Sequence, residues 1–91
     1  MTPIELAAEL KTLVLEAAEK QSPAGGLSDD EPLFGPDARL DLDSLDALQV
    51  SMAIQARFGV RMADSKETRR ALGSISRLAE YLAAQLATGQ R

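Results

Sequence analysis

Apolar residues recur at helical spacing in three stretches of the chain, and the first stretch lies at its start. Four apolar side chains share one face at i, i+4, i+7 and i+11: Leu6, Leu10, Leu13 and Ala17. The segment TPIE before them is a capping box, with Thr2 as N-cap, Pro3 at the first helical position and Glu5 reaching back from N3. A helix over about residues 3–20 is therefore expected, ending before Pro23.

The second helical stretch carries two neighbouring apolar stripes instead of one. It is expected over about residues 44–58, with Gly59 as its stop. One stripe consists of Ala47, Val50, Ile54 and Phe58. The other consists of Leu45, Leu48 and Met52. Together they are wider than a single buried face needs.

The remaining pattern completes an all-α fold. A short helix is expected over about residues 66–72 and a last main helix over about residues 75–87, with Ser74 as its N-cap. The apolar stripe of the last helix is Ile75, Leu78, Leu82 and Leu86. The predicted architecture is a small four-helix bundle, made of three main helices plus one short helix, in a single domain over residues 1–91.

A long polar connection over residues 22–43 separates the first two main helices. Loops of this length in a compact domain are usually functional or pinned. Leu33 and Phe34 are the expected pins, and Leu40 and Leu42 are expected to pack where the chain enters the second helix.

The composition removes several kinds of chemistry. The chain of 91 residues contains no cysteine and no histidine, so disulfides, Cys/His metal sites and catalysis by Ser-His-Asp or Cys-His groups are excluded. A Ser-Lys pair is the only nucleophilic option left, and no lysine lies near Ser44 in the sequence. We therefore do not expect the chain to be an enzyme.

Charge is distributed unevenly along the chain. Residues 1–56 carry 11 acidic and 3 basic residues, whereas residues 57–91 carry 3 acidic and 7 basic ones, for a net charge of −4. This balance disfavours nucleic acid as a partner. The sequence shows neither a signal-peptide pattern nor an apolar run of about 20 residues, so a cytoplasmic protein without membrane insertion is expected.

The segment LDLDSLDALQV raises the question of chemistry, because it places Ser44 among aspartates at a helix start. A serine there is usually an N-cap. Here Asp43 can take that role, with Asp46 at N3, where a negative charge suits the helix dipole. Ser44 then falls at N1 with a hydroxyl that the backbone does not need. The acids would repel a phosphate, so this is no pocket for free phosphate, but a covalently held phosphodiester needs no affinity of its own. The acids suit recognition by a basic partner.

From these residues onward the sequence resembles the acyl carrier protein family. The resemblance rests on DSLD at Asp43–Asp46, the helical pattern ALQVSMAIQARFGV after it, the upstream LFG and the final SISRLAEYL. It covers about Leu33 to Leu86, and the first helix only by pattern. Each motif is weak alone, but the combination in an acidic domain of this length is specific.

The resemblance implies that Ser44 is esterified to 4′-phosphopantetheine by a separate phosphopantetheinyl transferase. The thiol of the arm would carry acyl groups as thioesters to a ketosynthase, acyltransferase or acyl ligase, and the protein would act as a monomer. Asp43 would help the transferase and its metal ion engage, with Leu45 beside it. Asp46, Leu48 and Met52 would contact partners or the acyl chain, although plain core packing is an equal alternative for Leu48 and Met52.

The chain departs from the family's fatty-acid carriers along its second helix. Those carriers have a run of glutamates there, and this chain has Gln49, Gln55, Ala56 and Arg57. We therefore expect a specialised lipid, polyketide or other secondary-metabolite pathway. A carrier for aminoacyl groups is less favoured, because that variant usually has Gly-Gly where this chain has Leu42-Asp43. A helical interaction module with an unmodified Ser44 is the other alternative.

Overall fold

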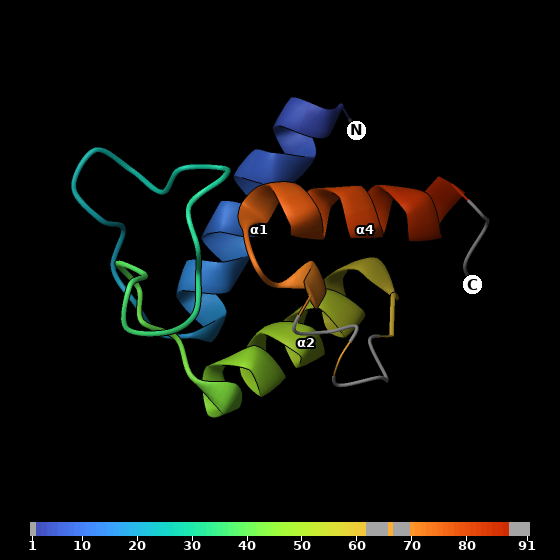
Figure 1. Cartoon of the computed structure of the whole chain (residues 1–91). Coiled ribbons are helices and arrows are strands. Elements are labelled where there is room, and N and C mark those ends of the chain that lie inside the picture. Colours follow the sequence, from blue (N-terminus) through green and yellow to red (C-terminus); the bar gives the residue numbers. More distant parts are fainter. Residues whose placement is uncertain (1, 62–65, 67–69, 88–91) are drawn as a thin grey trace.

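Three helices form the described part of the chain, and the fold is all-α as predicted. The computed structural model describes residues 2–61, 66 and 70–87. Its helices are α1 (Pro3–Ala17), α2 (Ser44–Phe58) and α4 (Ile75–Ala87). Helix α1 packs against both α2 and α4, and the long connection from α1 to α2 makes a wide excursion beside them (Figure 1). None of the helices in these residues is long and apolar enough to cross a membrane.

Helix α1 begins where the sequence predicts. The Glu5 backbone N–H donates to Thr2 Oγ1 (3.1 Å), and the Thr2 backbone N–H donates to Glu5 Oε1 (2.8 Å). This reciprocal pair is the expected capping box, and it satisfies two backbone donors that have no partner within the helix.

The end of α1 corrects the prediction of a helix to about residue 20. The helix stops at Ala17 because the next residues turn back on its last turn. Glu19 adopts a left-handed conformation (φ 56°), and the Lys20 backbone N–H donates to the Leu15 carbonyl (2.9 Å). This is a Schellman-type closure. Glycine usually occupies the left-handed position, so the glutamate leaves no signal in the sequence.

Helix α2 has the bounds predicted for it, and its two apolar stripes separate. Val50 and Ile54 are buried in the core, whereas Leu45, Leu48 and Met52 are exposed. The alternative that Leu48 and Met52 pack in the core is therefore wrong. Gly59 follows the helix in a left-handed conformation (φ 71°), and its N–H donates to the Gln55 carbonyl (2.9 Å). The remaining members of the first stripe, Ala47 and Phe58, are half-buried against the core.

Helix α4 starts at its predicted cap. The Arg77 backbone N–H donates to Ser74 Oγ (3.2 Å). The first three apolar residues of its stripe, Ile75, Leu78 and Leu82, are fully buried. Leu86 is the exception and lies exposed in the last turn. Of the short helix expected over about residues 66–72, Lys66, Arg70 and Ala71 are helical, and the others between 66 and 70 lie outside the described residues.

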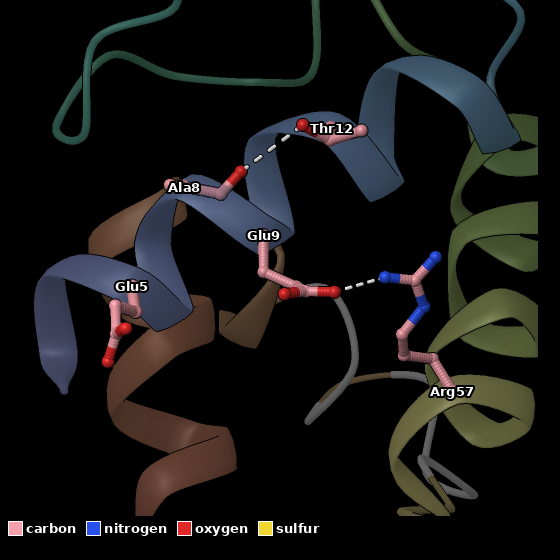
Figure 2. A pocket seen from close by; sticks show the side chains of 5 residues that line it. All are labelled: Glu5, Ala8, Glu9, Thr12 and Arg57. Carbon is pink, nitrogen blue, oxygen red and sulfur yellow. Dashed lines mark hydrogen bonds and ion pairs between the residues drawn. The ribbon is translucent and has the colours of Figure 1, made fainter. Parts of the chain in front are cut away.

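An ion pair joins α1 to the last turn of α2. The Arg57 guanidinium donates to the Glu9 carboxylate across the gap between the helices (Figure 2). These two side chains, with Glu5, Ala8 and Thr12, line a polar hollow of about 580 Å³. The pair lies at the end of α2 away from Ser44.

Backbone hydrogen bonds pin the long connection near both of its predicted anchors. The Leu42 N–H donates to the Leu33 carbonyl (3.2 Å), and the Gly35 N–H donates to the Leu42 carbonyl (3.4 Å). Phe34 and Leu42 thereby form an isolated parallel bridge. Leu33, Leu40 and Leu42 are buried and Phe34 packs half-buried against the core, which confirms the predicted pins.

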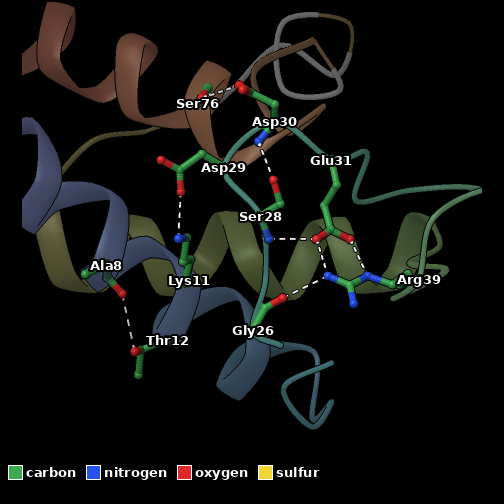
Figure 3. A network of polar contacts seen from close by, with 10 residues as sticks. All are labelled: Ala8, Lys11, Thr12, Gly26, Ser28, Asp29, Asp30, Glu31, Arg39 and Ser76. Carbon is green, nitrogen blue, oxygen red and sulfur yellow. Dashed lines mark hydrogen bonds and ion pairs between the residues drawn. The ribbon is translucent and has the colours of Figure 1, made fainter. Parts of the chain in front are cut away.

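A salt bridge that the sequence did not reveal closes the connection on itself. Arg39 donates through Nε to Glu31 Oε1 (3.0 Å) and through Nη2 to Glu31 Oε2 (2.6 Å). The same guanidinium donates to the carbonyls of Ala24 and Gly26 (2.8 Å each). Figure 3 shows Arg39 facing Glu31 and Gly26 from the far side of the loop. One side chain therefore holds together two stretches of the connection.

Further polar contacts tie this loop to the helices. Lys11 of α1 pairs with Asp29 (2.6 Å). The Ser76 backbone N–H donates to the Asp29 carbonyl (2.8 Å), and the Ser76 hydroxyl donates to the Asp30 carboxylate (2.7 Å; Figure 3). The connection is thereby attached to α1 and to the first turn of α4.

We predict that the two stripes of α2 differ sharply in their effect on stability. Ile54→Ala removes a fully buried side chain and should lower the free energy of unfolding by about 2–5 kcal/mol. Met52→Ala removes an exposed one and should change it by less than about 0.5 kcal/mol. Urea denaturation of both variants checks this. Equal losses would contradict the assignment of Met52 to the surface.

The Glu31–Arg39 pair should also make stability acid-sensitive. Arg39 and the Ser28 backbone N–H lower the pKa of Glu31 from its ordinary 4.5 to about 2. Because the folded pKa is the lower one, the stabilisation is complete above the ordinary pKa and is lost as the pH falls toward about 2. The free energy of unfolding should fall more steeply below about pH 4.5 in the wild type than in Glu31→Gln. If the free energies of unfolding of the two proteins fell equally with decreasing pH, this prediction would be wrong.

Candidate functional site

The first turn of α2 is held by two aspartates that cap each other. The Asp46 backbone N–H donates to Asp43 Oδ1 (3.0 Å), and the Asp43 backbone N–H donates to Asp46 Oδ2 (3.0 Å). Asp43 is the N-cap and Asp46 is at N3, as the sequence predicts. The reciprocal bond from Asp46 adds a feature that the sequence analysis did not identify, and it makes the first turn rigid.

The environment of Asp43 favours its ionised form. The Asp46 backbone N–H is the main cause, with a smaller contribution from the Leu45 N–H and the positive charge of Lys20, and together they hold the pKa of Asp43 below its usual range. The Asp43 carboxylate therefore carries a negative charge at neutral pH, directly before Ser44 in the chain.

That next residue, Ser44, has a hydroxyl that no other described group uses. Ser44 is the first residue of α2 and is exposed to solvent. Its hydroxyl makes no hydrogen bond to any residue that the structure describes, whereas Asp43 supplies the capping oxygen. Because the helix does not need this hydroxyl, the group is available to another molecule.

The third aspartate of the segment serves the backbone turn before α2. Asp41 has a left-handed conformation (φ 48°), which aspartate tolerates better than most residues. Its N–H donates to the Ala38 carbonyl (3.1 Å), and the turn brings Leu42 back alongside Leu33. The described residues contain no group of three or more acidic side chains that could hold a metal ion.

A largely apolar pocket lies directly beside Ser44. Its volume is about 480 Å³, which lies in the range of small-ligand pockets. It is formed by the connection, the start of α2 and the turn before α4, and its lining residues are Pro32, Phe34, Leu42, Asp43, Ser44, Ala47 and Gly73. A flexible chain attached to Ser44 could fold back against its apolar wall.

The structure divides the predicted site residues between two surfaces. Asp43 and Ser44 line the pocket. Leu45, Leu48 and Met52 do not line it, and these residues are 63%, 56% and 58% exposed.

Five of the seven pocket residues are not among the predicted site residues. Phe34, Leu42 and Ala47 are predicted only as pins or core residues, and no pattern in the sequence indicates Pro32 or Gly73. The Leu33 N–H donates to the Gly73 carbonyl (3.2 Å), which brings the two parts of the chain together. No local pattern signals a contact across forty residues of sequence, although the LFG segment did mark the neighbouring Phe34.

The chain matches a known protein family. Residues 8–82 of the chain, well over half of its length, match the family described as phosphopantetheine attachment site. A search of curated proteins found no significant match.

We predict that the two neighbouring residues Asp43 and Ser44 contribute very differently to folding. Asp43→Ala removes the N-cap and should lower the free energy of unfolding measurably. Ser44→Ala should change it by less than about 0.5 kcal/mol, because its hydroxyl makes no hydrogen bond to any described residue. Urea denaturation at neutral pH compares the two. A loss in Ser44→Ala as large as that in Asp43→Ala would show that the serine is the cap.

Proposed function

The chain belongs to the family of phosphopantetheine-carrying domains, and we propose that it bears its arm on Ser44. A domain of this family is a carrier and not a catalyst, its cofactor is covalent 4′-phosphopantetheine, and a phosphopantetheinyl transferase attaches it. The single observation that supports Ser44 is its exposed hydroxyl at the start of α2, which is left unbonded among the described residues because Asp43 caps the helix.

The attachment reaction makes simple demands on this chain. Ser44 Oγ forms a bond to the phosphorus of coenzyme A that bears the pantetheine, the bond from that phosphorus to the adenosine bisphosphate breaks, and the hydroxyl proton is released. The capping box holds the backbone of Ser44 at the first turn of α2, and Oγ has no hydrogen bond to a described residue that would have to break first. Asp43, ionised beside it, is the residue we propose to help the transferase and its metal ion engage.

The surroundings of Ser44 fit an arm of this kind. The bound group supplies a terminal thiol that carries an acyl chain as a thioester. The adjacent pocket offers an apolar wall from Phe34, Leu42 and Ala47, against which an attached chain can shelter from water. Ser44 opens onto this pocket and onto solvent, so the arm can leave it to reach an enzyme.

We further propose that the cargo is an acyl group of a specialised lipid, polyketide or other secondary-metabolite pathway. The support is the missing run of glutamates on α2, where Gln49 and Gln55 are exposed instead. A ketosynthase, an acyltransferase or an acyl ligase would then act on the loaded arm. Carriage of aminoacyl groups is the alternative. Efficient charging by general fatty-acid synthesis enzymes, side by side with their own carrier, would argue against a specialised role.

A helical interaction module with an unmodified Ser44 is the competing hypothesis for the site. It would leave the exposed hydroxyl without a purpose, and the family match argues against it. A cytoplasmic location and a monomeric state remain predictions from the sequence.

Intact mass distinguishes the two hypotheses. We expect the purified protein, incubated with coenzyme A, magnesium and a broad-specificity transferase, to gain the mass of one phosphopantetheine group. Ser44→Ala should gain none. Ser51→Ala is the matched control on the same helix, because the Ser51 hydroxyl is occupied by the Ala47 carbonyl (2.9 Å), and it should load like the wild type.

If several transferases gave no increase in mass, the proposed attachment at Ser44 would be wrong. If Ser44→Ala still gained the mass, the arm would lie on another residue. Circular dichroism of each variant shows that a missing gain is not due to unfolding.

A further inference from the structure

We propose that the ammonium group of Lys20 pairs with the phosphodiester that joins the arm to Ser44, and that it holds the base of the arm beside the end of α1. Lys20 lies just beyond α1, and Ser44 is the first residue of α2. This inference rests on the proposed attachment at Ser44. It adds to the attachment site a residue from a different element of the fold.

The packing of α1 against α2 brings these two places together. Glu9 of α1 pairs with Arg57 in the last turn of α2 (Figure 2). Two turns further along α1, Ala17 shares a shallow hollow with Ala53, which lies one turn earlier in α2. The two helices therefore run in opposite directions, and the end of α1 lies beside the start of α2 (Figure 1).

The turn that closes α1 places Lys20 at this end. The Lys20 backbone N–H donates to the Leu15 carbonyl (2.9 Å), and its side chain is exposed. After the Asp46 and Leu45 backbone N–H groups, the positive charge of Lys20 also lowers the pKa of Asp43. The ammonium group thus acts on the first turn of α2, where Asp43 directly precedes Ser44.

This ammonium group is not committed to another partner. Lys20 forms no ion pair with any residue that the structure describes. Three other basic side chains, in contrast, are paired with carboxylates: Lys11, Arg39 and Arg57. A lysine side chain has three donors on a flexible stem, so Lys20 can turn toward a new negative charge at little cost.

Attachment of the arm creates the need for such a cation. It adds a negative charge to Ser44, between the carboxylates of Asp43 and Asp46, which already lie in the same helical turn. Like charges this close repel each other even near a protein surface. A positive charge supplied by Lys20 offsets this repulsion and gives the base of the arm a fixed contact.

Arg77 is the competing cation. Its side chain packs over Gly73, where an added Cβ would lie 3.3 Å from Arg77 Cδ, and Gly73 lines the same pocket as Ser44. The favoured partner is Lys20, because its charge and not that of Arg77 contributes to the lowered pKa of Asp43. The experiment therefore includes a variant of each residue.

Phosphorus NMR of the loaded protein tests the contact directly. We expect the resonance of the phosphodiester to move in Lys20→Gln relative to the wild type. The difference should shrink as NaCl rises from about 0.1 to about 1 M, over which the Debye length falls from about 10 to about 3 Å. Arg61→Gln is the matched control and should leave the resonance in place, because it removes the same charge from an exposed residue beyond the other end of α2.

A thermodynamic cycle measures the strength of the pair. The equilibrium constant of unfolding is determined for the unloaded and loaded forms of each protein. At low salt, attachment should raise this constant about two- to fivefold more in Lys20→Gln than in the wild type, which is the range of an exposed ion pair. Lys20→Arg keeps the positive charge and should behave like the wild type, as should Arg61→Gln.

The possible results separate this inference from the proposed function. If Lys20→Gln loads normally but neither moves the resonance nor changes the cycle, Lys20 is not the partner of the phosphodiester, although attachment at Ser44 stands. If Arg77→Gln gives both effects in its place, the phosphodiester pairs with α4 and the inference is likewise wrong. If the wild type does not load on Ser44, the attachment and this inference are rejected together.

Discussion

The site depends on one local interaction, the reciprocal hydrogen bonds between Asp43 and Asp46 at the start of α2. The first backbone donors of a helix need partners, and a helix that began with Ser44 alone would draw its hydroxyl into that task. Because the preceding aspartate caps the helix, the serine is the first helical residue and yet its hydroxyl makes no hydrogen bond to any described residue. The same arrangement keeps two negative charges where the helix dipole favours them.

The capping box in turn depends on how the chain arrives at it. The bridge between Phe34 and Leu42 and the left-handed turn at Asp41 fix the residues just before the cap. Arg39 holds the earlier part of the connection against the later part. The same segment supplies the wall of the pocket beside Ser44, so the connection both positions the serine and shapes its surroundings.

The two opposite faces of helix α2 differ in their environment. Val50 and Ile54 anchor it in the core, while Leu45, Leu48 and Met52 remain in water, where three apolar side chains on one face have no folding role. That they contact a partner or the acyl chain stays a prediction from the sequence. The helix has no ionisable side chain from Ala47 to Ala56.

The sequence by itself determined what short-range hydrogen bonds and helical periodicity control: the starts of the three helices, the caps at Thr2, Asp43 and Ser74, and the fact that Ser44 is not needed as a cap. Each of these is decided within about four residues. Tertiary structure decided the rest. Glu19 ends α1 in a left-handed conformation that its residue type does not predict. Arg39 pairs with Glu31, eight residues earlier in the chain. Above all, periodicity shows that α2 has two apolar stripes but not which one is buried, because burial depends on where the other helices lie.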